Sequence, residues 1–165
     1  MLIVGIIIKL ESSGPIFYFS KRIGKNNKIF LMPKFRTMDV NTPEIETSKF
    51  NKKNKITSLG KYLRKFSIDE LPQIISILKG DMSIVGPRPA LFNQKELIKK
   101  RTKLGINKLV PGLTGLAQIN GRDNITLKKK VFYDNEYMKN RSLFFDLKII
   151  LKTVLVAINL KDIKH

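Results

Sequence analysis

The sequence contains no cysteine, and its single histidine is the last residue, His165. Without thiols the chain can form no disulfide, no thiolate metal site and no cysteine nucleophile. A histidine-dependent site, such as a hydrolase triad or an HExxH zinc motif, would have to rely on a terminal residue, and chain ends are commonly frayed. The chemistry of this protein therefore depends on carboxylates, cations, hydroxyl groups or a hard metal ion.

Long apolar runs are also missing. The run at 2–8 would rise only about 10 Å as a helix, against roughly 30 Å of bilayer hydrocarbon, and it lacks the features of a signal peptide. The pattern leaves two interpretations open: a buried strand or core-helix edge, and a segment that dips into a membrane. At 143–160, apolar residues recur at helical spacing, which predicts an amphipathic helix facing a core or a lipid interface.

Acidic residues are scarce: 13 Asp and Glu stand against 32 Lys and Arg, which gives a net charge of +19. This excess points to a polyanion, an anionic membrane surface or a phosphate-rich substrate, although AT-rich coding would also produce part of it. With 165 residues, of which 42% are hydrophobic and 27% charged, the chain has the size and composition of one globular domain.

The residue patterns predict an α+β domain that is mostly helical and has a small sheet. Strands at 16–19 and 28–38 form a hairpin around a turn at 24–27, with Pro33 at an edge or a bulge. A polar loop follows at 39–55. Helices are expected from Thr57 or Ser58 to about Phe66, then up to Gly80, and at 92–103 and 125–140, with a shaped loop at 111–122.

The segment 67–73 contains adjacent carboxylates, and its local structure can be interpreted in two ways. Ser67 and Glu70 have the spacing of a capping box. With Asp69 as the cap instead, Pro72 falls in the first turn, and the helix amides favour an anion at Asp69. Capping and catalysis both remain open for Asp69. Because consecutive residues on a helix point about 100° apart, we expect Asp69 and Glu70 to have different tasks.

Several cations are candidates for binding phosphate. Two prolines fix the backbone on either side of Arg88, so its planar fork is preorganised to hold an oxyanion; the alternative is a rigid turn with a surface arginine. Lys34 and Arg36 share one face of a strand, although such pairs arise by chance in so basic a chain. Arg122 follows an Asn-Gly turn that is structural or binds a ligand. Without internal His or Cys, an Asp nucleophile with Mg²⁺ is plausible.

Five segments together resemble the bacterial sugar transferase family, whose members are the monotopic polyprenyl-phosphate phosphoglycosyl transferases. They are the strings at 13–17, 34–38, 67–73, 79–89 and 111–122, which occur in order across residues 5–160. The resemblance implies transfer of a sugar 1-phosphate from a nucleotide diphosphate sugar, usually a UDP-sugar, to undecaprenyl phosphate. This reaction starts assembly of a membrane glycan, such as exopolysaccharide, capsule, O-antigen or glycoprotein, at the cytoplasmic face of the bacterial inner membrane.

The resemblance also implies residue roles. Asp69 would attack the phosphate that bears the sugar, release UMP and form an aspartyl phosphosugar. Glu70 would bind Mg²⁺, together with Asp69, or manage the acceptor's proton. Arg88 would grip phosphate, and the lesser candidates for the diphosphate, nucleotide or acceptor are Lys34, Arg36, Pro87 and Arg122.

The N-terminus departs from the family pattern. Members normally carry a longer hydrophobic helix that enters the membrane and returns, and Met1 falls where its second limb would lie. We therefore expect a partial membrane-associated segment at 1–13 and a catalytic domain at 14–165. The alternatives are an inactive truncated transferase and a non-catalytic basic module that binds nucleic acid or membrane. No nucleic-acid partner is expected, because the sequence shows no zinc spacing or aromatic-rich sheet motif. The sugar, the pathway and the oligomeric state are left open.

Overall fold

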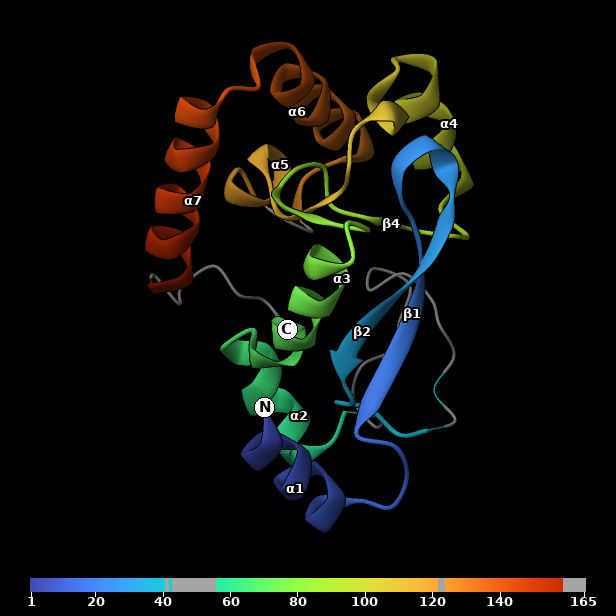
Figure 1. Cartoon of the computed structure of the whole chain (residues 1–165), viewed down its shortest axis with the longest axis vertical. Helices are drawn as coiled ribbons and strands as arrows, with labels where there is room; N and C mark the ends of the chain where they lie inside the picture. Colours follow the sequence, from blue (N-terminus) through green and yellow to red (C-terminus); the bar gives the residue numbers. More distant parts are fainter. Residues whose placement is uncertain (41, 43–55, 122–123, 159–165) are drawn as a thin grey trace.

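The computed structural model describes residues 1–40, 42, 56–121 and 124–158. The chain is a mostly helical α+β protein, as predicted (Figure 1). Its principal elements are α1 (Leu2–Glu11), β1 (Phe17–Ile23), η1 (Lys25–Asn27), β2 (Ile29–Phe35), α2 (Ser58–Lys65), η4 (Ile68–Gln73), α3 (Ile74–Leu78), β3 (Ser83–Val85), β4 (Ala90–Leu91), α4 (Lys95–Lys103), η5 (Ile106–Lys108), β5 (Gly112–Thr114), α5 (Leu116–Ile119), α6 (Leu127–Asn140) and α7 (Leu143–Ile158). Within the described ranges no helix is both long and apolar enough to cross a bilayer.

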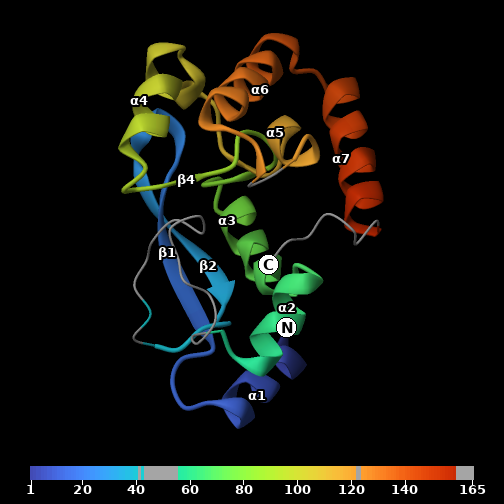
Figure 2. The same ribbon diagram turned by 180° about the vertical axis from the view of Figure 1, so that it is seen from behind.

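The predicted hairpin is confirmed. Strands β1 and β2 pair antiparallel without interruption from Phe17 opposite Phe35 to Ile23 opposite Ile29, and the strand order β2-β1-β4 leaves β2 at the edge. Pro33 lies opposite Phe19 in this regular register, so it occupies an edge strand and not a bulge. The hairpin runs along one side of the molecule, from α1 at one end to α4 at the other (Figures 1 and 2). The predicted polar loop lies mostly outside the described residues.

Helix α2 begins as predicted, because the Thr57 hydroxyl accepts a hydrogen bond from the Gly60 amide at 3.0 Å. The next element differs from both capping interpretations. Ser67 adopts a left-handed backbone conformation (φ 55°) and makes no capping bond with its side chain, and Asp69 lies inside the 3₁₀ helix η4. The backbone itself supplies the bond that a cap would make, since the Glu70 amide donates to the Ser67 carbonyl at 3.2 Å.

Helices α1, η4 and α3 expose much of their apolar surface. The segment at 2–8 is part of helix α1 and not a strand; it buries Gly5 and Ile8. In η4 and α3 the polar side chains of Gln73 and Ser76 are buried. Most large apolar side chains of α1, η4 and α3 are exposed, namely Leu2, Ile3, Ile6, Ile7, Leu10, Leu71, Ile74, Ile75 and Leu78.

The segment at 111–122, expected to be a shaped loop, contains strand β5 and helix α5, so that expectation was wrong for most of it. Strand β5 pairs in parallel with β3, with Val85 opposite Thr114. Gly112 allows the close approach, because a Cβ there would collide with the backbone of Gly86. Pairing with a strand so distant in sequence leaves no local signal, which is why the loop interpretation failed.

Two hydrophobic clusters lie at the two ends of the molecule. The smaller is formed by Ile8, Phe35 and Leu63, where α1, β2 and α2 meet. The larger joins β3, α4, η5, α6 and α7, and includes Leu97, Ile106, Val131 and Ile149. Helices α6 and α7 confirm the helices predicted at 125–140 and 143–160. Between the clusters, η4 packs against β2, and this contact builds the candidate site.

Candidate active site

The packing of η4 against β2 brings Lys34 to the two adjacent carboxylates. Lys34 Nζ lies 2.8 Å from Glu70 Oε1 and 4.0 Å from Asp69 Oδ2. All three side chains are largely covered: the exposed fractions are 16% for Lys34, 14% for Glu70 and 10% for Asp69. A cation predicted on one strand thus meets an acidic pair that follows more than thirty residues later in the chain.

Arg88 approaches the same carboxylate from the proline-flanked loop. Its Nη2 donates to Glu70 Oε1 at 2.8 Å, so Arg88 and Lys34 share one oxygen of Glu70. The Arg88 side chain is 34% exposed, which makes it the most accessible member of the cluster. Loop, strand and 3₁₀ helix therefore converge on Glu70.

The two adjacent carboxyls have opposite electrostatic environments. For Glu70, burial acts to raise the pKa, but Arg88 and Lys34 outweigh it and hold the pKa well below the usual range. For Asp69, burial raises the pKa, against an opposing effect of Lys34. Glu70 is thus a stably ionised partner for two cations, whereas Asp69 is a poorly hydrated carboxyl beside them. That the two residues have different tasks stays a prediction.

Arg64 is a third cation near the pair, and the sequence reasoning missed it. Its guanidinium interacts electrostatically with Asp69 and Glu70, and its Nε donates to Thr37 Oγ1 at 2.9 Å. Burial lowers the pKa of Arg64, and the two carboxylates oppose this effect. Helices α2 and η4 are in contact across the left-handed turn at Ser67, and this contact places Arg64 near Asp69. An arginine in the last turn of a helix, just before an acidic pair, was the available signal.

The comparison with known proteins identifies the chain. The family described as bacterial sugar transferase matches residues 1–160. The chain belongs to the bacterial sugar transferase family. It is 37% identical to the exopolysaccharide production protein ExoY of Rhizobium meliloti, over 93% of this chain and 74% of the relative.

Longer relatives match over a smaller share of their length. The undecaprenyl-phosphate galactose phosphotransferase of Salmonella typhimurium is 37% identical over 90% of this chain and 34% of its own length. The UDP-glucose:undecaprenyl-phosphate glucose-1-phosphate transferase of Escherichia coli K12 is 37% identical over 92% of this chain and 34% of its own length. This sugar transferase chain therefore corresponds to about a third of such proteins.

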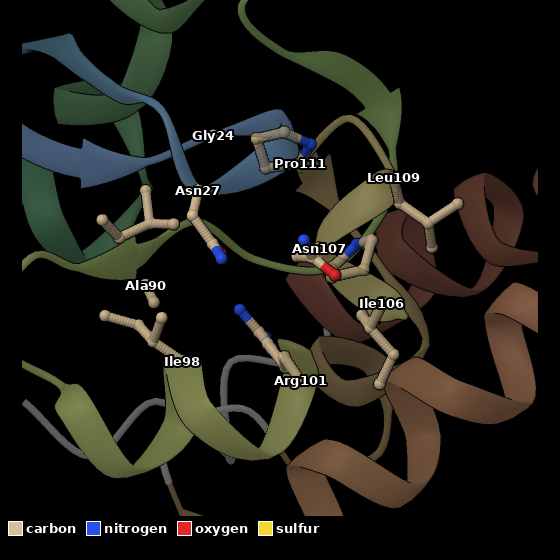
Figure 3. Close-up of a pocket in the computed structure, with 11 residues that line it drawn as sticks. Gly24, Asn27, Ala90, Ile98, Arg101, Ile106, Asn107, Leu109 and Pro111 are labelled. Carbon is tan, nitrogen blue, oxygen red and sulfur yellow. The ribbon is translucent and has the colours of Figure 1, made fainter. Parts of the chain in front are cut away.

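The other candidate residues of this sugar transferase form no hydrogen bond or ion pair with the acidic pair in the part of the chain that the structure describes. Arg36 follows β2, is buried, and donates to the carbonyls of Ser12 and Ser13 at 2.8 and 2.5 Å, so it ties the end of α1 to the strand that carries Lys34. Pro87 is one of the residues that line a small cavity. Figure 3 shows this cavity with Arg101 and Ile106 labelled. Arg122 lies outside the described residues.

Two adjacent carboxylates are a donor set of the kind that Mg²⁺ takes from a protein when substrate completes its coordination. Across the described residues no three His, Cys, Asp or Glu side chains come together as a ligand set. Mg²⁺ commonly takes one or two protein carboxylates and completes its octahedron with waters and substrate phosphates. Asp69 and Glu70 are the residues that would hold such an ion.

Proposed function

We propose that this chain moves a sugar 1-phosphate from a UDP-sugar to undecaprenyl phosphate, with Asp69 as the nucleophile. The observation on which this rests is the buried Asp69 carboxyl beside Glu70. Glu70 Oε1 accepts hydrogen bonds from both Lys34 and Arg88 at 2.8 Å. A carboxylate next to fixed cations is suited to attack a phosphorus atom, since phosphoryl transfer depends mainly on positioning and on neutralising charge. The names of the Salmonella and Escherichia coli relatives support the choice of substrates.

In the first step, an oxygen of Asp69 forms a bond to the phosphorus that bears the sugar. The bond between this phosphorus and the bridging oxygen of the diphosphate breaks, and UMP leaves with its electron pair. The product is an aspartyl phosphosugar. Burial makes the Asp69 carboxylate poorly hydrated, which favours attack, while Lys34 favours its ionised form. Arg88 and Lys34 neutralise charge on the phosphate oxygens, and Glu70 holds both cations in place.

In the second step, a phosphate oxygen of undecaprenyl phosphate attacks the same phosphorus. The bond to Asp69 breaks, the carboxylate is regenerated, and undecaprenyl diphosphate sugar is released. Mg²⁺, when bound by Asp69 and Glu70, supplies further neutralisation of the diphosphate. Because UMP leaves before undecaprenyl phosphate reacts with the covalent intermediate, the reaction follows ping-pong kinetics.

Because the acceptor is a lipid, the proposal includes binding of the protein to the cytoplasmic face of the bacterial inner membrane. The exposed apolar side chains of α1, η4 and α3 support this, because α3 keeps Ser76 inside and presents Ile74, Ile75 and Leu78 outward. An apolar surface of this kind commonly marks a partner or lipid interface. The net charge of +19 supports attraction to anionic lipids.

The deciding experiment measures UMP release from a panel of UDP-sugars by purified protein in detergent with Mg²⁺ and undecaprenyl phosphate. Asp69→Asn is expected to abolish turnover, whereas the exposed Asp81→Asn keeps it. Without acceptor, labelled UMP should exchange into the UDP-sugar through the covalent intermediate. Full turnover by Asp69→Asn, or turnover without such exchange, would contradict the nucleophile assignment.

A further inference from the structure

The loop that carries Arg88 is held through its carbonyl groups. Pro87 and Pro89 have no backbone N–H, so two of its three residues can donate no backbone hydrogen bond. The Pro87 carbonyl accepts from the Gly112 amide at 3.0 Å. The Pro89 carbonyl accepts from Arg22 Nη1 at 3.2 Å, and the Arg88 carbonyl accepts from Arg101 Nη1 at 2.8 Å. Donors from β5, β1 and α4 therefore set the course of the backbone.

Arg101 has the most extensive of these attachments. Its Nε and Nη2 donate to Asp134 Oδ2 on α6 at 2.9 and 2.7 Å, while Nη1 reaches the Arg88 carbonyl. The Asp134 side chain is only 2% exposed and that of Arg101 11%. One guanidinium thus joins α4, α6 and the loop, and an ion pair so well covered is screened little by solvent.

A small cavity borders the loop on this side. Arg101 and Pro87 line this cavity beneath the hairpin turn, together with Asn27 and Ile106. Figure 3 shows Arg101 projecting from α4 toward this space, with Asn27 opposite. A gap forfeits van der Waals contacts, so the hydrogen bond from Arg101 is the more important restraint there.

We propose that Arg101, fixed by Asp134, is a positioning residue that aims Arg88 at Glu70. Arg101 acts on the backbone of residue 88, and the side chain of the same residue donates to Glu70 Oε1. Arg101 makes its bonds to Asp134 and to the Arg88 carbonyl with three separate nitrogens of its planar guanidinium. Lysine has one nitrogen and cannot reproduce this geometry. The catalytic consequence rests on the proposed transferase function.

The first test is a double-mutant cycle between Arg101→Lys and Arg88→Ala, with kcat/KM for UDP-sugar as the readout. Arg101→Lys is expected to lower kcat/KM by about tenfold to a hundredfold, as is usual when a supporting residue of a site is changed. In the Arg88→Ala background, the same change should cost nothing further. Lys100→Gln, on the exposed face of the same helix, is the matched control and should leave activity unchanged.

Two results of the cycle overturn the proposal. One is a double variant whose fold-loss in kcat/KM equals the product of the two single fold-losses, which means that Arg101 acts independently of Arg88. The other is full activity of Arg101→Lys. Circular dichroism and thermal unfolding confirm that each variant is folded. If Arg101→Lys does not fold, Asp134→Asn replaces it in the cycle, because it keeps the shape of the partner and weakens the hold on Arg101.

A second test needs no activity and so separates this proposal from failure of the transferase function. The side-chain Nε–Hε signal of Arg88, assigned by its loss in Arg88→Ala, reports mobility through its NMR order parameter. Arg101→Lys is expected to lower that order parameter, whereas Lys100→Gln should not. An unchanged order parameter in Arg101→Lys overturns the positioning role even if the wild-type chain turns over no UDP-sugar.

Discussion

Arg88 Nη2 lies 2.8 Å from Glu70 Oε1, and this contact joins a proline-flanked loop to the turn that also carries Asp69. Glu70 thereby holds the most accessible cation of the site beside the proposed nucleophile. The same oxygen accepts from Lys34. Removing its charge should affect both the chemistry and the stability of this region.

Glu70→Gln is expected to reduce kcat/KM by about a hundredfold or more, because Lys34 and Arg88 lose their common anion and separate. Leaving Lys34 and the partly exposed Arg88 without this carboxylate should also lower the free energy of unfolding by about 1–3 kcal/mol. Enzyme kinetics and urea denaturation measure the two effects. The control is Glu96→Gln, which removes an exposed carboxylate paired with Lys100 and should change little. Equal behaviour of the two variants would contradict the role given to Glu70.

Acid should destabilise the protein partly through Glu70. Its pKa is lower in the folded chain than the unfolded value of about 4.3, so its contribution is present above that pH and is lost as pH falls through the folded pKa. Burial raises the pKa of Asp69 and Asp134, so these residues act in the opposite sense.

Comparison of the wild-type protein with Glu70→Gln isolates the effect of Glu70 on acid stability. The gap between their free energies of unfolding should be widest near neutral pH and should narrow below about pH 4. Denaturant titrations at pH values from about 7 to about 3 measure it. A gap that stays constant over this range would show that Glu70 does not have a depressed pKa in the folded chain.

The left-handed backbone of Ser67 is a second target for mutation. A residue with a Cβ is disfavoured at φ 55°, and a β-branched residue more so. Ser67→Gly is therefore expected to preserve stability or raise it by up to about 1 kcal/mol, and Ser67→Val to lower it by about 1–3 kcal/mol. Thermal unfolding gives the values. The reverse order would show that the turn between α2 and η4 has another conformation.

The exposed apolar face of α3 should decide binding to lipid. Replacing Ile74 and Leu78 by serine is expected to reduce sedimentation with vesicles of anionic lipid several-fold without lowering the unfolding midpoint, since both side chains are exposed. Leu104→Ser, at the end of α4, removes an exposed leucine elsewhere and should have little effect. Unchanged sedimentation of the double variant would exclude this face from the lipid interface.

Local sequence patterns were enough for much of the fold. The hairpin, the start of α2 at Thr57 and the helices α6 and α7 follow from alternation, capping and helical spacing, which act over a few residues. The two capping interpretations of 67–73 were wrong because the backbone makes its own hydrogen bond there, from the Glu70 amide to the Ser67 carbonyl, in the 3₁₀ helix that follows Ser67. The β3–β5 pair was missed because its strands are short and far apart in the sequence.

The composition and motifs alone determined which chemistry is available: no thiol, no internal histidine, an adjacent Asp69 and Glu70, and an arginine fixed between prolines. They also placed the chain in its family. Only the tertiary structure decided which side chains contact one another in the site. It put Lys34 and Arg88 on one oxygen of Glu70, returned Arg64 to Asp69, and linked Arg101 to both Asp134 and the Arg88 backbone. Those contacts join residues distant in sequence, and such pairings depend on how whole elements pack, which no local pattern records.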